Sequence, residues 1–419
     1  MTFMMTGLFA LLLFLSVPVG YALIMASGTA IRWQGGTPTV LAVVKLFQPT
    51  QSFPLLAIPF FILSGSLMMS GTLGQKLVQF AAAMVGRFHG GMGQVTVVGS
   101  TIFGGVSGSA VAEASALGSM LIPWQKREGY PAGFAAAVTA SSSTIAGLIP
   151  PSIPLILYST VSNTSIASLF SAAILPGLML AFGMMLVCYF SGRLRNFPRL
   201  SNRAELTGFG RSLLSALPAL AMPFFIILLL RAGIATPTEV SVIAVFYALV
   251  VSLLLYRDLT LARLQEALVG TVITTGVVML VIAASSLVGH VLITERIPAM
   301  VAQWSQETLG TPVLIILMMN LIMLVVGMFL DLPAAILLLG PTFVAIGQAI
   351  GMDPIQLGVM ICINLSIGLF TPPIGTTLFI GAAIARVPIG AVVKELWPFY
   401  LVAFLVLVLI SYIPAFTIY

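Results

Sequence analysis

Two polar, proline-bearing stretches decide the fold: "TASSSTIAGLIPPSIP" at residues 139–154 and "INLSIGLFTPPIGTT" at residues 363–377. Each lies in apolar sequence long enough to cross a bilayer, and each has a glycine followed by a Pro-Pro pair. A proline removes a backbone donor and clashes with the preceding turn, so two in succession predict an opened helix. Within a membrane, opened backbone is tolerated only where protein buries it or where it lines a cavity. Two matching breaks therefore predict a binding site.

Composition places the whole chain in a membrane. Of 419 residues, 59% are hydrophobic and only 7% are charged, against about 25% charged in soluble domains. The apolar runs are long and do not alternate, which favours an all-α polytopic membrane protein over a transmembrane barrel. The basic residues are scattered over short loops, which argues against nucleic acid as a partner. Cys188 and Cys362 lie in apolar runs and are expected to be buried small residues.

The apolar runs predict the following elements. Spanning helices are expected at 3–30 (kinked at Pro18 and retained rather than cleaved), 53–70, 167–192, 213–232, 239–256, 268–290 and 391–413. We expect a mixed loop at 31–52, amphipathic helices at 72–88 and 295–307, and Pro-broken spans at 132–160 and 357–384. Residues 93–123 and 312–350 each hold two apolar pieces, too short to span alone at about 20 residues per crossing. We therefore expect two re-entrant helical hairpins.

The two halves of the chain repeat. Pro372 lies 222 positions after Pro150. At the same offset Pro151 aligns with Pro373, Pro176 with Pro398 and Gly118 with Gly340. The predicted organisation is a first repeat at 1–192, a cytoplasmic basic linker at 193–212 and a second repeat at 213–419. The linker holds five arginines (193, 195, 199, 203 and 211) and one acid, Glu205.

Charge predicts the orientation. With the N-terminus in the cytoplasm and each hairpin re-entering the side it left, 13 of the 17 basic residues lie inside. Outside are Arg32, Lys45, Arg231, Arg296 and the C-terminus. Positive residues favour the cytoplasmic side. The first hairpin then enters from inside and the second from outside, which is the inverted-topology plan of many secondary transporters.

Hairpin tips and broken helices expose oxygens that can replace the water shell of a small hard cation. The first tip holds Ser107, Gly108 and Ser109, facing the first break with Ser141, Ser142 and the carbonyls of Ile149 and Pro150. The second tip holds Gly327 and Asp331, and its break supplies Asn364, Ser366, Gly368, Thr371 and Thr376. Half-helix N-termini beyond each break can attract a carboxylate. We expect one cation site per repeat and an anionic substrate between them, lined by Ser141, Ser142, Asp331, Asn364 and Thr376.

Simpler roles stay open for several of these residues. Membrane Ser and Thr often bond back to their own helix or join helices, and Gly104-x-x-x-Gly108 could serve packing alone. Asp331 could cap the helix that starts near Pro333. Glu113 could bind a cation or carry a proton, and the sequence does not choose. No His/Cys/Asp/Glu cluster has transition-metal spacing, and no phosphate loop is present.

Five stretches together resemble the large membrane subunit of tripartite ATP-independent periplasmic (TRAP) transporters. They are "GGVSGSAVAEASALGSMLIP", "SSSTIAGLIPPSIPLILY", "TEVSVIAVFYAL", "GMFLDLPAAILLLGP" and "NLSIGLFTPPIGTTLF". The resemblance implies an elevator-type transporter in the bacterial inner membrane, with a periplasmic C-terminus. It implies Na⁺-driven uptake of an organic acid, together with a small membrane subunit and a periplasmic substrate-binding protein. By motif, the Na⁺-site candidates are Ser107, Ser109, Gly147, Ile149 and Pro150, then Gly327, Gly368 and Thr371.

Two rival functions remain at this point. One is a stand-alone Na⁺- or H⁺-coupled carboxylate carrier that needs no binding protein. The other is an intramembrane serine protease, since Gly105-Val106-Ser107-Gly108 fits Gly-x-Ser-Gly and His290 could act as base. The protease hypothesis leaves the second break and the repeat unexplained, so we expect a transporter and no enzyme. No cofactor is expected apart from Na⁺ as coupling ion.

Overall fold

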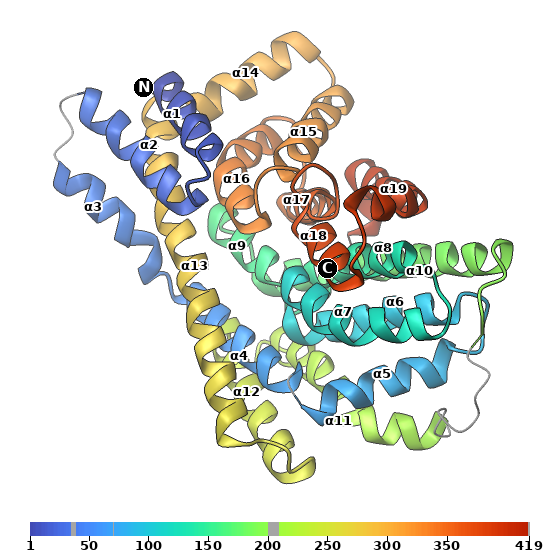
Figure 1. The fold of residues 1–419 in the computed structure, drawn as a ribbon. Coiled ribbons are helices and arrows are strands. Elements are labelled where there is room, and N and C mark those ends of the chain that lie inside the picture. Colours follow the sequence, from blue (N-terminus) through green and yellow to red (C-terminus); the bar gives the residue numbers. More distant parts are fainter. Residues whose placement is uncertain (35–38, 70, 200–208, 418–419) are drawn as a thin grey trace.

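The computed structural model describes residues 1–34, 39–69, 71–199 and 209–417, and every regular element in these ranges is helical (Figure 1). The first half holds α1 (Thr2–Phe14), α2 (Val19–Gln34), α3 (Thr39–Phe47), α4 (Ala57–Met69), α5 (Thr72–Val85), α6 (Gly91–Ser107), α7 (Ala110–Arg127), α8 (Ala132–Ser142), α9 (Ile153–Ser162) and α10 (Ile166–Leu194). The second holds α11 (Phe209–Arg231), α12 (Pro237–Val250), α13 (Leu261–Thr294), α14 (Ile297–Leu309), α15 (Pro312–Gly327), α16 (Leu332–Ala349), α17 (Pro354–Gly368), α18 (Thr376–Ala385) and α19 (Ile389–Tyr412). Short turns are η1 (Gln48–Gln51), η2 (Phe53–Leu56), η3 (Ser143–Gly147), the π-helical η4 (Val251–Leu255) and η5 (Pro414–Phe416).

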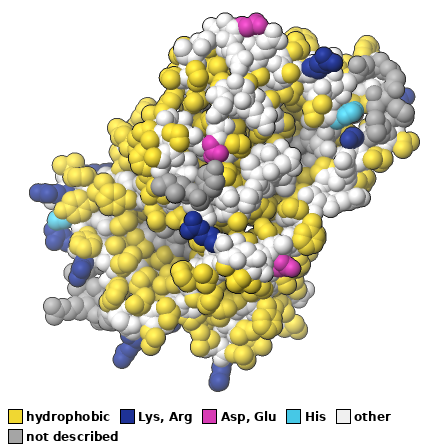
Figure 2. Space-filling view, turned by 180° about the vertical axis from the view of Figure 1, so that it is seen from behind, with side chains coloured by type: hydrophobic (Ala, Val, Ile, Leu, Met, Phe, Trp, Pro, Cys, Tyr) yellow, Lys and Arg dark blue, Asp and Glu magenta, His cyan; other side chains and the backbone are white. Residues whose placement is uncertain are grey.

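Six of the described helices are long and apolar enough to cross a bilayer. A seventh crossing is possible if Ala42–Gln51 and Phe53–Met69, bent by 62°, count as one span. In the space-filling view, hydrophobic side chains are spread widely over the visible face, and charged side chains are scattered among them (Figure 2). The chain is thus a multi-pass helical membrane protein.

The helix boundaries recur at the offset of 222 found in the sequence. Adding 222 to the bounds of α7, 110 and 127, gives 332 and 349, which are the bounds of α16. The start of α8 at 132 likewise maps to the start of α17 at 354. Tips and breaks therefore occupy equivalent places in the two halves.

The N-terminal region differs from the prediction. A single kinked span at 3–30 is wrong: α1 and α2 pack against each other as a helical hairpin, with Ser16 in the left-handed region at φ 62°. Residues 31–52 are not a loop either, because α2 continues to Gln34 and α3 and η1 follow. Of the predicted linker, Arg203 and Glu205 lie outside the described residues, and α10 and α11 occupy its two ends.

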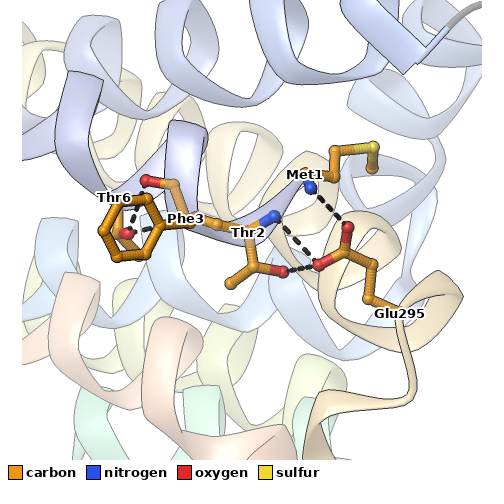
Figure 3. Close-up of polar contacts among 5 residues, drawn as sticks. All are labelled: Met1, Thr2, Phe3, Thr6 and Glu295. Carbon is orange, nitrogen blue, oxygen red and sulfur yellow. Dashed lines mark hydrogen bonds and ion pairs between the residues drawn. The ribbon is translucent and has the colours of Figure 1, made fainter.

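The hairpin of α1 and α2 packs against the long helix α13. Helix α13 packs along α2, α3, α4 and α16, and Figure 1 shows it running down one side of the molecule. At its far end, Glu295 accepts the Thr2 N–H at 2.9 Å and pairs with the Met1 amino group at 2.7 Å (Figure 3). Met1 and Arg296 therefore lie at one end of α13. Their predicted placement on opposite sides of the membrane cannot hold.

These contacts give a prediction for α1. Hydrogen bonds and the charge of the Met1 amino group lower the pKa of Glu295 to about 2. Because the pKa of this carboxyl is lower in the folded protein than in the unfolded chain, its ionised form stabilises the fold at pH values above the ordinary carboxyl pKa. This stabilisation is lost as the pH falls toward 2. We expect Glu295→Gln to increase the rate of amide hydrogen exchange in α1 at neutral pH. As the pH falls, the exchange rate in the wild type should approach that of the mutant. Glu307→Gln is the control, since among the described residues Glu307 accepts only from Gln303, four residues away. Equal exchange in wild type and Glu295→Gln would contradict this role.

Several basic residues that the charge pattern assigned to the inside make contacts between distant segments. Asp258, bonded to Arg263, also accepts the backbone N–H of Thr72 at the start of α5. Lys126 donates to the carbonyl of Ala385 at 3.0 Å. Arg195, at the end of α10, forms a bidentate pair with Glu395 of α19. These contacts tie together segments that the charge pattern assigned to one side of the membrane.

Candidate functional site

The first hairpin tip is bonded to the first break. Gly108 and Ser109 join α6 to α7, and the Gly108 carbonyl accepts the Ile153 N–H just after the Pro-Pro pair at 3.3 Å. Gly108 has φ 60°, and a Cβ there would lie 2.2 Å from the carbonyl oxygen of Pro151. Only glycine fits both the conformation and the contact. Ser109 begins α7, where its hydroxyl accepts the N–H of Ala112.

The second tip meets the second break in the same way. Residues 328–331 join α15 to α16, and the Met328 carbonyl accepts the Ile374 N–H at 3.2 Å. A Cβ on Gly368 would lie 2.3 Å from the carbonyl oxygen of Gly327. The glycines at the two helix ends thus allow backbone to touch backbone.

Both predicted openings are confirmed, because helices stop before each Pro-Pro pair and restart after it. The Pro150–Pro151 and Pro372–Pro373 bonds are both cis. The two breaks also face each other: a Cβ on Gly147 would lie 3.1 Å from the Ser366 hydroxyl. The Thr377 hydroxyl lies 3.0 Å from the carbonyl oxygen of Ala140 and 2.9 Å from that of Leu369. We call these two tips and two breaks the central junction.

A cavity of about 140 Å³, the tip cavity, adjoins the first tip. Ser107, Ser109 and Ala112 line one wall, and residues of α4 and α13 line the other, including Ser66, Gly270 and Thr274. Helix α4 comes close here, since a Cβ on Gly65 would lie 2.9 Å from Cα of Ser107. The structure therefore sets the two tip serines against a hydroxyl-bearing wall from other helices.

The remaining cation-site candidates lie within the breaks. Gly147 and Pro150 are buried and Ile149 is partly exposed. The Gly147 carbonyl accepts the Ser152 hydroxyl at 2.6 Å. Thr371 donates its hydroxyl to the carbonyl of Ile367 at 2.6 Å, and a hydroxyl oxygen that donates can still act as an acceptor. Each predicted set is thus brought to its own half of the central junction.

The predicted substrate-lining residues occupy different surroundings. The Ser141 hydroxyl bonds back to the carbonyl of Ala137. Asn364 is buried and donates to Asn320 of α15 at 2.7 Å, while Thr376 has no hydrogen-bond partner for its buried hydroxyl among the described residues. Asp331 sits at the N-cap position of α16, exposed, and makes no side-chain capping bond. Their substrate contacts remain predictions.

Glu113 lies inside the protein on α7. Its side chain is fully buried, and neither carboxylate oxygen has a hydrogen-bond partner among the described residues. Ser100 of α6 lies close enough to interact with this carboxylate, and its hydroxyl bonds Ser142 of the first break at 2.9 Å. A buried unpaired carboxylate is costly unless a proton or a cation neutralises it. Both roles that the sequence left open for Glu113 fit this position.

The protease arrangement is not formed in the structure. Ser107 lines the tip cavity, whereas His290 lines a separate cavity beside α3. The fold and the central junction instead define a helical membrane transporter.

Comparison with known proteins gives the family. Residues 6–416 match the family model described as tripartite ATP-independent periplasmic transporter, DctM component. The C4-dicarboxylate TRAP transporter large permease protein of Pseudomonas aeruginosa is 37% identical, covering 89% of this chain and 87% of that protein. The sialic acid TRAP transporter large permease protein of Vibrio cholerae is 36% identical, covering 97% and 95%. The chain therefore belongs to the TRAP transporter large-permease family, as the sequence resemblance predicted.

A solved structure supports the fold at a greater distance. The crystal structure of the Alcanivorax borkumensis YdaH transporter has a TM-score of 0.64 and 14% identity, covering 90% of this chain and 87% of that one. The chain is thus a multi-pass inner-membrane protein and a transporter permease, and the prediction of a non-enzyme is confirmed by its named relatives.

Proposed function

We propose that this chain is the large membrane subunit of a Na⁺-coupled symporter that imports an organic acid. The observation that carries the proposal is the central junction, in which two hairpin tips each bond to a proline-broken helix. Such sites bind ions and substrate in secondary transporters. The relatives above are named for C4-dicarboxylates and sialic acid, both of which are organic acids.

The Na⁺ sites are the two tip–break pairs. In the first, Ser107 and Ser109 supply hydroxyls and Gly147, Ile149 and Pro150 supply carbonyls. In the second, Gly327 and Gly368 supply carbonyls and Thr371 a hydroxyl. The acid binds between them, against the residues predicted to line the substrate. Because the first tip reads Ser-Gly-Ser and the second Phe-Leu-Asp, the two sites differ in chemistry.

Orientation follows from the charged ends of α13. The Arg263 end faces the cytoplasm, because Arg257 and Arg263 are among the basic residues that the charge pattern assigns to the inside, and the Glu295 end faces the periplasm. This puts Met1 on the periplasmic side, in place of the cytoplasmic position expected from the sequence. The hairpins α6–α7 and α15–α16 re-enter from opposite sides, although α16 alone, at 18 residues, is long enough to cross. Movement of the tip-bearing part against α4 and α13 gives an elevator-type cycle.

The partners are a small membrane subunit and a periplasmic substrate-binding protein, as separate chains. The experiment is uptake of labelled succinate and sialic acid into proteoliposomes, with Na⁺ or K⁺, and with or without the small subunit and the binding protein. Uptake that needs Na⁺ and the binding protein is expected. Uptake without the binding protein would favour the stand-alone carrier, and no uptake of either acid under any condition would contradict this substrate class.

A glycine beside the tip cavity gives a steric test. Gly270 is exposed and lines this cavity, and a Cβ there meets nothing within 4 Å, so there is room for a larger side chain beside the cavity. We expect Gly270→Leu to lower the maximal uptake rate at least about tenfold by blocking the space before the Ser107 tip. Gly276→Leu is the matched control on the same helix, since Gly276 is also exposed with nothing within 4 Å of a Cβ but does not line the tip cavity. Equal rates in the two variants would exclude the tip cavity from the transport path.

A further inference from the structure

A second, larger cavity of about 510 Å³ lies on the other half of α13. One wall comes from α3 and η1 with α13, including Lys45, Ser285 and His290. The other wall comes from the last turn of α9, at Thr160, and from the interior of α16, at Leu337 and Pro341. Helix α9 starts at the first break and α16 at the second tip, so this α13 cavity lies between α13 and two helices that lead to the central junction.

The polar groups of the α13 cavity suit an anion. Lys45 brings an ammonium group and His290 an imidazole, and no Asp or Glu lines the cavity among the described residues. Lys45 uses one donor on Gln48 Oε1 at 3.0 Å, leaving two further N–H donors. An ammonium beside a cavity without opposing carboxylates attracts anionic solutes.

One buried hydroxyl points to a missing ligand. Ser285 is 4% exposed, lines the cavity, and its hydroxyl has no hydrogen-bond partner among the described residues. Its neighbour Ser286, by contrast, donates to the carbonyl of Lys45 at 2.9 Å and so holds α3 against α13. Buried hydroxyls are normally satisfied, and an anionic oxygen in the cavity would accept from Ser285.

We propose that the α13 cavity is an entry vestibule that binds the acid group of the incoming substrate through Lys45, His290 and Ser285 before the acid reaches the central junction. The inference rests on the proposed function, and it adds a second anion site near the Glu295 end of α13. Its volume lies within the usual range of small-molecule sites, about 300–1,000 Å³.

A charge-selective labelling experiment tests the vestibule without requiring transport. Gly289 lines the cavity and a Cβ there meets nothing within 4 Å, so Gly289→Cys places a thiol inside it. The two native cysteines, Cys188 and Cys362, are fully buried. The purified chain in zwitterionic lipid nanodiscs is treated with sulfonatoethyl methanethiosulfonate, which is anionic, or its trimethylammonium analogue. Thr311 is exposed in the turn before α15, so Thr311→Cys gives the ratio of the labelling rates of the two reagents at a solvent-exposed thiol.

We expect the anionic reagent to be favoured about tenfold at position 289 relative to position 311. Adding Lys45→Gln should remove most of this preference, and His290→Gln should reduce it. Arg32→Gln is the charge-matched control, because Arg32 is exposed at the end of α2 and does not line the cavity. Equal selectivity at positions 289 and 311 would overturn the anion site.

Protection by substrate separates this inference from the proposed function. An acid that the wild type transports should slow labelling at position 289, whereas its uncharged diamide or ester should not. If a transported acid gives no protection, the entry role is overturned. If no acid is transported, the proposed function fails, and the charge preference with its loss in Lys45→Gln alone decides whether the cavity binds anions.

Discussion

Replacing Gly368 with alanine is expected to abolish transport. The new Cβ would lie 2.3 Å from the carbonyl oxygen of Gly327 and 2.7 Å from its Cα. Both are backbone atoms at the end of α15, so no side-chain rotation can relieve the overlap. Overpacking costs about 1–3 kcal/mol and occasionally more. We expect the second tip to separate from its break, with uptake in proteoliposomes near background and a lowered melting temperature.

Two companion variants make this result specific. Gly108→Ala should act similarly at the first tip, because it combines φ 60° with a Cβ 2.2 Å from the carbonyl oxygen of Pro151. Gly390→Ala in α19 is the control, since a Cβ there meets nothing within 4 Å. Wild-type uptake and stability in Gly368→Ala would show that the tip and the break need not touch.

Removing single hydroxyls from the two tip–break pairs should weaken Na⁺ coupling while leaving expression intact. Ser107→Ala and Thr371→Ala each delete one proposed oxygen ligand. A hydrogen-bond-like contact to a charged group is worth about 1.5–3 kcal/mol, so the Na⁺ concentration for half-maximal uptake should rise roughly tenfold or more. The measurement is uptake at fixed acid concentration over a Na⁺ titration.

The control variant also removes a single hydroxyl, but from a position outside the proposed Na⁺ sites. Thr101→Ala removes a hydroxyl from α6 that bonds the carbonyl of Val97, two turns before the tip. Its Na⁺ titration should match that of the wild type. Unchanged titrations in both Ser107→Ala and Thr371→Ala would exclude these residues from the Na⁺ sites.

Local sequence signals predicted the most unusual part of the fold. Pro-Pro pairs in apolar runs located both breaks because proline acts on its own helix, whatever surrounds it. The short apolar pieces around Gly108 and Gly327 located both helix pairs by length alone. The α1–α2 turn was missed because Ser16 takes a left-handed conformation without a glycine or asparagine to signal it.

Contacts between distant segments could not be predicted from the sequence. The wall facing Ser107 comes from Gly65, Ser66 and Thr274, which carry no motif. The bond from Ser100 to Ser142, and the burial of Glu113 near it, likewise depend on how α6, α7 and α8 pack. Met1 beside Glu295 joins residues 294 positions apart along the chain, and this contact places the N-terminus at the same end of α13 as Arg296.

Helix α13 borders both cavities, at Gly270 and Thr274 for one and from Ile282 to Ile293 for the other. From Thr274 to Ser285 an α-helix rises about 17 Å, more than half of a hydrocarbon core of about 30 Å. Turning a side chain cannot carry a solute that far. In the elevator-type cycle proposed above, a solute would cover this distance by moving together with the tip-bearing helices, while α13 stays in place beside them.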